Sequence, residues 1–483
     1  MAKTIFEKLQ EGQRAYSLPS DSLDFQKYMP PQNILRCKQA ILPEISELDL
    51  MRHFNGLAKK NMGIDTNFYP LGSCTMKYNP RINELCANLK GFIKTHPFAP
   101  ENSVQGNLQL IFELIEILCD IVGMSAGTLL PNAGAQGEFV GIRMISEYHK
   151  KNGELQRDEI LIPDSAHGTN PATAQMAGFK TIPIRTNVEG DMDLNELRKA
   201  VSNRTAGLML TNPNTLGLFS SAIHEVCDII HEHGGLVYYD GANLNAIMYI
   251  SKPAAMGCDV MHINLHKTFS TPHGGGGPGS GPVLCNDKLK PFLPLPRVEM
   301  HDDNYSLVWN DQASIGNIAS FHGNFAIYLR AYIYAKLHGK YGLRRISEQA
   351  VLNANYLKKR LSKLFKIPFP QPCMHEFVAQ ADNYLQYGVK ALDIAKRLLD
   401  YGLYAPTIYF PLIIRECMLI EPTETESKAT LDFFIDTLET IVQEIQNNPE
   451  LVKTAPHHMS VGRLNEVQAA KHPILREIMN YEV

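Results

Sequence analysis

Short apolar segments alternate with amphipathic ones through the middle of this chain, and this alternation limits its fold more than any other feature. The apolar segments are 159–162, 181–184, 207–210, 236–239 and 260–263. Segments with helical periodicity lie between several of them. Continuous apolar strands separated by helices are typical of a parallel sheet that is covered on both faces. We therefore expect an α/β fold with a mostly parallel sheet covered by helices.

The remaining segments suggest how this sheet is flanked. Residues 1–95 are expected to form an N-terminal arm with a lid-like loop, because the first part is polar and interrupted by prolines. Residues 96–335 carry the strand pattern and are expected to form the large cofactor-binding domain. Two long helices are expected at 319–337 and 343–364. Residues 336–483 are expected to form a smaller α+β domain, with further helices or strands at 376–379, 391–399, 417–420 and 429–446.

Composition removes several classes of function. The 483 residues carry a formal net charge of −4 and show no block of Lys and Arg, so nothing favours a nucleic-acid partner. No run approaches the ~18 apolar residues of a membrane span, and the N-terminus lacks the apolar segment of a secretory signal. The nine cysteines are scattered without a CxxC pair, which indicates reduced thiols. We expect a cytoplasmic protein without a membrane or nucleic-acid partner.

A carboxylate and an amine stand at the ends of two predicted strands. Asp240 ends the apolar run 236–239, and Lys267 follows the run at 260–263. Ligands of an open parallel sheet bind outside the carboxyl ends of its strands, so both side chains are expected at one edge. Pyridoxal phosphate requires an amine that forms a Schiff base and an acid that pairs with its pyridinium nitrogen. The pair predicts this cofactor; the alternative is a turn-capping Asp and a solvated Lys.

Two further segments fit the same cofactor. The segment 130–138 opens a predicted helix at 135–149, and small residues at a helix N-terminus can hold a phosphate. An ordinary helix start is the alternative. His167 follows the strand at 159–162, where an imidazole could lie flat on a pyridine ring; a structural histidine is the alternative.

Other patterns argue against nucleotide and metal sites. The glycine-rich run 274–279 is neither a P-loop nor a dinucleotide-binding fingerprint, and it fits a close-packed turn beside a cofactor. His262 and His266 are expected to share one face of a strand without the ligand geometry of a metal site. No metal site is predicted. The loop 69–80 is expected to cover the site, or to act as a lid whose hydroxyls meet a small substrate.

Eight segments resemble the P-protein family of the glycine cleavage system. They are FYPLGSCTMKYNP (68–80), LPNAGAQGE (130–138), SAHGTNPA (165–172), YYDGANLNA (238–246), NLHKTFSTPHGGGGPGSGP (264–282), LNANYLKKRL (352–361), YAPTIYFP (404–411) and IEPTETESK (420–428). The resemblance implies pyridoxal-phosphate fold type I, which is the aspartate-aminotransferase-like fold. The length is similar to that of the second, lysine-bearing subunit of the two-subunit bacterial form.

The resemblance also implies an activity, partners and roles for residues. The expected reaction is decarboxylation of glycine, with transfer of the aminomethyl group to the lipoyl group of the H-protein. A subunit 1 is the expected partner in an α2β2 heterotetramer. Lys267 is the expected catalytic residue and binds the cofactor. The other expected cofactor-binding residues are Asp240, His167, Gly134, Ala135, Gln136, Ala242, His266 and Thr268.

Other functions remain open from the residues alone. Another fold type I enzyme, such as an aminotransferase, an amino-acid decarboxylase or a cysteine desulfurase, would use the same Asp and Lys. An aminotransferase would grip the substrate carboxylate with a late Arg, for which Arg415 is the nearby candidate. A desulfurase would need a nucleophilic Cys on a loop, and no cysteine here is marked out for that role. A non-catalytic scaffold subunit is the remaining alternative.

Overall fold

The computed structural model describes residues 3–16, 25–37, 42–274 and 279–475, which group into two compact units. The smaller unit is formed by residues up to Gly63 together with Met459–Val461. Its helices are η1 (Phe6–Lys8), α1 (Phe25–Tyr28), η2 (Gln32–Ile34) and α2 (Glu47–Ala58). The larger unit holds the rest of the described chain. The expected domain boundaries at 95 and 335 stay predictions.

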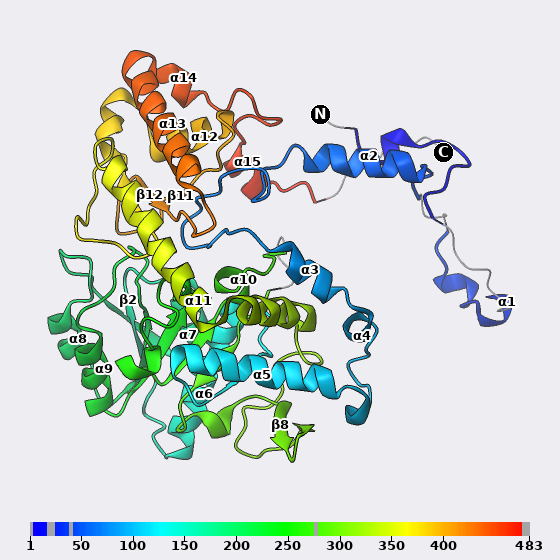
Figure 1. Ribbon diagram of the computed structural model, residues 1–483, viewed down its shortest axis with the longest axis vertical. Helices are drawn as coiled ribbons and strands as arrows, with labels where there is room; N and C mark the ends of the chain where they lie inside the picture. Colours follow the sequence, from blue (N-terminus) through cyan, green and yellow to red (C-terminus); the bar gives the residue numbers. More distant parts are fainter. Residues whose placement is uncertain (1–2, 17–24, 38–41, 275–278, 476–483) are drawn as a thin grey trace. The chain divides into compact units, whose positions relative to one another are not determined.

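The larger unit is built on a seven-stranded sheet with the order β1-β7-β6-β5-β4-β2-β3. Strand β2 of this sheet is labelled in Figure 1, with helices around it. Strands β2 to β6 are parallel to their neighbours within that group, whereas β7 runs antiparallel to both β1 and β6. The five strands predicted from apolar runs are confirmed as β2 to β6, and the sheet is mostly parallel. The strands are β1 (Ala126–Thr128), β2 (Glu159–Pro163), β3 (Lys180–Ile184), β4 (Thr205–Thr211), β5 (Leu236–Gly241), β6 (Val260–Ile263) and β7 (Val283–Cys285).

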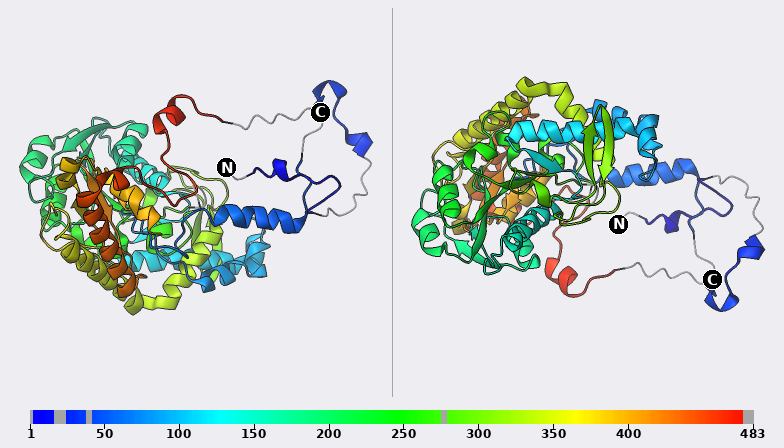
Figure 2. Two further views of the ribbon diagram at one scale, coloured as in Figure 1. Left: turned by 90° about the horizontal axis from the view of Figure 1, so that it is seen from above. Right: turned by 90° about the horizontal axis from the view of Figure 1, so that it is seen from below.

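Helices pack on both faces of this sheet (Figure 2). Successive residues of a strand point to opposite faces, so Tyr238 packs among apolar side chains of α6 and α7, whereas Tyr239 packs among those of α5, α8, α9 and α11. Both tyrosines are fully buried. The helices are α5 (Gln105–Val122), α6 (Gly134–Lys151), α7 (Thr169–Met176), α8 (Leu194–Ala200), α9 (Ile223–Glu232) and α11 (Phe325–Leu361).

The long helical segment α11 is interrupted at Gly339. This glycine has φ 58° and ψ −178°, values that lie outside the helical range and that favour glycine because it lacks a Cβ. The two predicted long helices are therefore confirmed as the two parts of α11, although the first begins at Phe325 and not at 319. Residues 319–324 form a turn ahead of the helix.

A second apolar core forms around a three-stranded antiparallel sheet with the order β10-β12-β11. The C-terminal part of α11 and the helices α12 and α13 contribute to this core, as does Phe68. The predicted segments in this part of the chain are confirmed. The elements are β10 (Phe377–Gln380), η7 (Asp382–Tyr387), α12 (Ala391–Asp400), β11 (Thr407–Ile408), β12 (Cys417–Ile420), α13 (Lys428–Asn447), α14 (Pro449–Lys453) and α15 (Glu466–Lys471).

Shorter elements complete the larger unit. A hairpin of β8 (Arg297–His301) and β9 (Asn304–Val308) packs against α5. The remaining helices are α3 (Arg81–Ala87), α4 (Lys90–Ile93), η3 (Glu101–Ser103), η4 (Leu244–Ala246), η5 (Pro253–Met256), α10 (Leu265–Thr268) and η6 (Lys290–Phe292). The glycine-rich turn predicted at 274–279 falls largely on residues 275–278, which lie outside the described residues. Within the described ranges, no helix combines the length and the apolar character needed to cross a membrane.

Candidate active site

Three neighbouring strands bring polar side chains together where the strands end. Thr211 of β4 is the register partner of Asp240 of β5, and Asp240 is in turn the partner of His262 of β6. Lys267 lies in the short helix α10, which starts directly after β6. All four residues line one cavity of about 170 Å³. As predicted, Lys267 and Asp240 both lie where neighbouring strands end, and both line this cavity.

Seven of the nine predicted site residues line this cavity. They are Lys267, Asp240, His167, Gly134, Ala135, Ala242 and His266. The side chain of Gln136 instead accepts a hydrogen bond from the N–H of Asn132 (2.7 Å) and donates one to the carbonyl of Ile318 (2.8 Å). Thr268 is fully buried behind the cavity. The cofactor-binding roles assigned to these nine residues stay predictions.

Asp240 is buried but is supported as an anion. It accepts hydrogen bonds from the side-chain amide of Asn170 (3.1 Å) and from the N–H of Ala242 (3.0 Å). Burial alone would raise the pKa of its carboxyl group, but His262, these two donors and Lys267 hold that pKa below its usual range. Asp240 therefore keeps a negative charge in the cavity, as pairing with a protonated ring nitrogen would require.

Behind Asp240 lies a second buried acid, Glu138 of α6. It accepts hydrogen bonds from the hydroxyl of Thr169 (2.7 Å) and from the side-chain amide of Asn170 (3.0 Å). Burial, and next the negative charge of Asp240, raise the pKa of Glu138 to about 7. The same Asn170 amide donates to both acids, so it fixes their separation. One of the two acids holds the charge and the other is positioned to hold a proton.

The arrangement of the histidines corrects one expectation. His262 and His266 do not share a strand face, because β6 ends at Ile263 and His266 lies in α10. His262 is held by the hydroxyl of Tyr238, whose oxygen lies 2.5 Å from Nδ1, and its Nε2 lies 3.5 Å from Asp240. Burial lowers the pKa of His262, whereas the negative charge of Asp240 opposes this shift, so each of the two groups favours the charged form of the other. Both histidines line the cavity beside Lys267.

The loop around Ser73 is fastened to the C-terminal segments of the larger unit. Ser73 lines the cavity, and its N–H donates to Glu376 (2.7 Å). Lys77 is buried and donates to Glu424 (2.8 Å), to Asn245 (2.8 Å) and to the carbonyl of Thr268 (2.7 Å). This carbonyl belongs to the residue after Lys267, so the loop supports α10 from behind.

Cys74 lies in the same loop. Its sulfur is partly buried, and burial raises the pKa of the thiol to about 11 despite the opposing charge of Lys267. The group is therefore a thiol at neutral pH, whereas reactive cysteines carry a thiolate.

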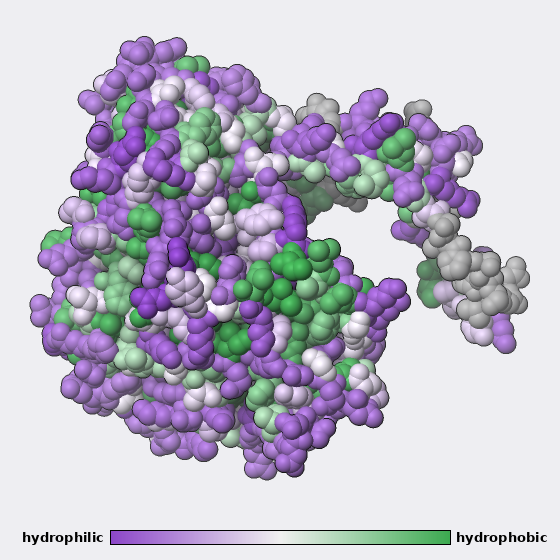
Figure 3. Space-filling model, viewed as in Figure 1, coloured by the Kyte–Doolittle hydropathy of each residue, from purple (hydrophilic) through white to green (hydrophobic). Residues whose placement is uncertain are grey.

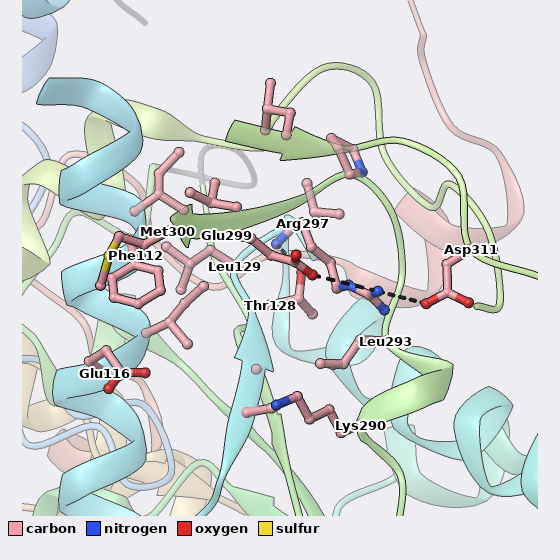
Figure 4. Close-up of a pocket in the computed structure, with 18 of the residues that line it drawn as sticks. Phe112, Glu116, Thr128, Leu129, Lys290, Leu293, Arg297, Glu299, Met300 and Asp311 are labelled. Atoms are coloured by element: carbon pink, nitrogen blue, oxygen red, sulfur yellow. Dashed lines mark hydrogen bonds and ion pairs between the residues drawn. The ribbon is translucent and has the colours of Figure 1, made fainter. Parts of the chain in front are cut away.

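A larger cavity of about 660 Å³ lies elsewhere in the same unit, between α5, β1 and β8 (Figure 4). Its wall carries apolar side chains such as Phe112 and Leu129, and its charged Arg297 is paired with Asp311 at 2.6 Å. None of the nine predicted site residues lines this cavity. Size alone would therefore select this larger cavity, whereas the chemistry of Lys267 and Asp240 favours the smaller one.

Several residues of the site were not predicted. Glu138 and Asn170 connect α6, α7 and β5, and Thr215 and Asn243 line the cavity. Glu138 and Asn170 lie in segments that the sequence had already singled out, and their polar side chains beside small residues were the available signal. Thr211 ends β4 and Thr215 lies in the loop that follows, positions that the rule of strand ends would also have indicated.

Comparisons with known proteins agree with this geometry. The family described as "Glycine cleavage system P-protein" matches residues 13–306, and "Glycine dehydrogenase, C-terminal domain" matches residues 346–459. A protein of Thermosipho melanesiensis named "Probable glycine dehydrogenase (decarboxylating) subunit 2" is 52% identical over 98% of both chains. A protein of the same name from Shouchella clausii is 52% identical over 99% of this chain and 98% of its own.

Solved structures share the fold. A crystal structure of glycine decarboxylase (P-protein) of the glycine cleavage system, in inhibitor-bound form, has a TM-score of 0.74 at 18% identity and covers 87% of this chain and 95% of its own. A NifS-like protein has a TM-score of 0.60 at 16% identity, and the match covers 78% of this chain and 99% of the NifS-like chain. The fold is fold type I of the pyridoxal-phosphate enzymes, as predicted. With family matches across most of its length and relatives of the same length, the chain belongs to the glycine cleavage system P-protein family.

Proposed function

We propose that this chain is the lysine-bearing subunit of a pyridoxal-phosphate enzyme that decarboxylates glycine and passes the aminomethyl group to the lipoyl group of the H-protein. Relatives named as glycine dehydrogenase subunit 2 support the reaction. The observation that carries it is one small cavity lined by Lys267, Asp240 and His167. A non-catalytic scaffold subunit would not require the amine of Lys267 and the buried carboxylate of Asp240 in one cavity.

The residues of the cavity suit pyridoxal phosphate. The hydroxyl of Thr211 and Nδ1 of His266 are buried without a hydrogen-bond partner among the described residues, so they are available to a polar ligand. The first turn of α6 has no side-chain cap at Ala133, which leaves N–H groups free for a phosphate. A Cβ at Gly134 would lie 2.4 Å from Asn264 Oδ1, so the glycine lets the start of α6 pack closely against the Asn264 side chain.

The chain's own residues would divide the work on glycine. Pyridoxal phosphate, when bound, supplies an electron sink for the electrons that are left when the substrate loses CO2. Lys267 would attach the cofactor through its amine, and Asp240 would keep the ring nitrogen protonated by holding its own negative charge. His167 stands on the cavity wall and contacts Phe410 edge-on, with 5.6 Å between ring centroids. Its role would be to stack on the ring.

The small cavity fits a substrate without a side chain. Its volume of about 170 Å³ must hold both the reacting ends of the cofactor and the substrate. Rejecting one methyl group contributes only about 1–3 kcal/mol of discrimination, so we expect alanine to be a poor substrate and not an excluded one. Among the described residues that line the cavity there is no Arg, and Arg415 lies exposed away from it, which is unlike the aminotransferase alternative.

A partner subunit and a carrier protein complete the proposal. Relatives are named as the second subunit of glycine dehydrogenase, so we propose a subunit 1 as partner, in an α2β2 heterotetramer, and lipoylated H-protein as acceptor. Apolar side chains are exposed along α3 and just after it, including Leu85 (68% exposed) and Leu89 (53%). Figure 3 shows apolar side chains gathered on this face near α3. An exposed apolar patch of this kind is typical of a protein interface.

Exchange of labelled bicarbonate into glycine tests the proposed function. The purified chain, loaded with pyridoxal phosphate and mixed with subunit 1 and lipoylated H-protein, should catalyse glycine-dependent exchange. Omission of subunit 1 or of lipoylated H-protein should reduce the rate of this exchange. Lys267→Ala should abolish exchange and should prevent borohydride from fixing the cofactor to the chain, while its melting temperature stays close to that of the wild type. Exchange at the normal rate in this variant would exclude the role of Lys267.

A further inference from the structure

A second group of buried ionisable side chains lies beside the site. His375 and Glu376 immediately precede β10, and Glu421 immediately follows β12. Because β10 and β12 are antiparallel with Phe377 opposite Ile420, these flanking residues are brought together. All three are at most 1% exposed, and one side-chain N or O atom from each lies within 4.8 Å of the others. The proposed function assigns nothing to this group.

The two acids hold the loop that borders the cavity. Glu376 accepts the N–H of Ser73 at 2.7 Å. Glu421 accepts both the N–H of Thr75 (3.0 Å) and its hydroxyl (2.5 Å). Ser73 and Thr75 have φ of 67° and 49°, left-handed values that are unfavourable for residues with a Cβ. Such a backbone persists only when its surroundings hold it, and here two carboxyl groups do so.

The positions of the donors show which acid carries a proton. Two buried carboxylates this close cannot both be ionised, so one of them is protonated. Glu421 uses both oxygens to accept hydrogen bonds, which favours its anion. Glu376 accepts only one, and its Oε1 has no partner among the described residues. Burial and the charge of Glu421 raise the pKa of Glu376 well above its usual value.

The third member of the group, His375, is a buried imidazole. Neither of its ring nitrogens has a hydrogen-bond partner in the described part of the chain, although the side chain is fully buried. Burial and the nearby Lys267 lower the pKa of His375 to about 3, so the ring is neutral and leaves the charge of the group to the acids. Its Nε2 lies 3.8 Å from Glu421 Oε1. Burial also raises the pKa of Glu421, to about 7, so Glu421 is partly ionised at neutral pH and the group carries at most one negative charge, on Glu421.

Other charges around the pair act in opposite directions. Lys267 favours the ionised form of both acids, whereas Glu424 opposes ionisation of Glu421. Lys77 forms an ion pair with Glu424 at 2.8 Å and so offsets this repulsion. Cys74, between Ser73 and Thr75, stays a neutral thiol because burial raises its pKa to about 11. In the chain without cofactor, Lys267 is therefore a positive charge that favours the anion of Glu421.

We propose that Glu376, protonated beside the ionised Glu421, is a positioning residue that holds Ser73–Thr75 against the cavity of Lys267. The N–H of Ser73 by itself favours the ionised form of Glu376. Loss of the proton nevertheless places two like charges beneath the loop, and their repulsion separates the carboxylates that hold Ser73 and Thr75. Ser73 then no longer occupies its place on the cavity wall. This inference rests on the proposed function for its kinetic consequence, but the clamp itself is a property of the chain.

Amide hydrogen exchange of the peptide that contains Ser73 and Thr75 tests the clamp in the full-length, cofactor-loaded chain. Glu376→Gln keeps the acceptor and cannot ionise, whereas Glu376→Ala removes the acceptor. At neutral pH we expect exchange in the Gln variant within about twofold of the wild type, and about tenfold faster exchange in the Ala variant, as loss of one buried hydrogen bond would produce. Glu426→Gln is the matched control, because burial alone raises the pKa of Glu426 to about 7, and among the described residues no hydrogen bond or ion pair joins its side chain to the loop.

The pH series separates a clamp that depends on a proton from a merely structural contact. After correction for the intrinsic pH dependence of exchange, the wild-type peptide should exchange faster as the pH becomes alkaline, and the Gln variant should not. Equal acceleration in both, or a Gln variant that exchanges as fast as the Ala variant at neutral pH, would overturn the proposal. If the Ala variant does not fold, the comparison between the wild type and the Gln variant still decides the outcome.

Kinetics in the bicarbonate exchange provide a second readout. The Ala variant should raise the KM for glycine about tenfold, with a smaller change in kcat, and the Gln variant should restore it. A normal KM in the Ala variant would refute the positioning role. If the wild type itself shows no exchange, the proposed function fails, while the hydrogen-exchange experiment still judges the clamp.

Discussion

Glu138 gains a proton on folding, and this makes the stability of the site depend on pH. Its pKa rises from the usual 4.5 to about 7 in the folded chain. Between these values the folded state holds a proton that the unfolded state has lost, so stability falls as the pH rises through this window. The full effect is on the order of 3 kcal/mol. Between pH 5 and pH 8, thermal unfolding should show a smaller loss of stability in Glu138→Gln than in the wild type. If the stability of both proteins changes with pH in the same way, Glu138 is ionised throughout this range.

Single residues of the site were predictable only where the chain itself marked them. Asp240 and Lys267 each follow an apolar strand, and the carboxyl ends of parallel strands meet at one edge. Gln136 was grouped with its neighbours because it starts the same helix, but its side chain turns to Asn132 and Ile318. Asn170 of α7 donates hydrogen bonds to both Glu138 of α6 and Asp240 of β5. No local sequence pattern predicts a contact that joins three separate elements.

The start of α6 depends on a glycine that lies far away in sequence. A Cβ on Gly281 would lie 2.2 Å from the carbonyl oxygen of Ala133 and 3.1 Å from Cα of Gly134. Both contacts are with backbone, so Gly281→Ala must displace the first turn of α6. We expect at least a tenfold weaker affinity for pyridoxal phosphate, measured by absorbance titration, because the phosphate would lose aligned N–H donors. Gly106→Ala, where nothing lies within 4 Å, should leave the affinity unchanged.

Element prediction followed the strength of the local pattern. The four-residue apolar runs were sufficient to locate β2 to β6, and the helical segments predicted at 135–149, 319–337 and 343–364 located α6 and the two parts of α11. Strands β1 and β7 are three residues each, too short to show a period, and they are defined by their antiparallel pairing with each other. The same pairing extends the sheet beyond the predicted parallel strands. Tertiary contacts, and not the local sequence, place them.

The molecule as a whole has two units whose distinction the sequence suggested only in outline. The polar, proline-interrupted N-terminal segment was expected to be an arm, and residues up to Gly63 do group apart from the sheet-bearing unit. The loop at 69–80, which was expected to belong to the arm, packs with the C-terminal sheet. Leu71 forms an antiparallel β-bridge with Ile420, and Tyr69 stacks on Tyr404 with 3.8 Å between ring centroids. Long-range contacts of this kind cannot be read from composition.

The exposed face of α3 makes assembly testable. Helix α3 is anchored to α11 by the Glu84–Arg330 ion pair (2.7 Å), which leaves Ile82 and Leu85 directed to solvent at 42% and 68% exposure. If subunit 1 covers this face, Leu85→Glu should bury a charge at the interface and weaken co-purification with subunit 1 at least tenfold. Because the side chain is exposed in the isolated chain, its melting temperature should not change. Leu155→Glu, at a position 76% exposed after α6, is the control and should bind normally. Equal binding by both variants would place the partner on another surface.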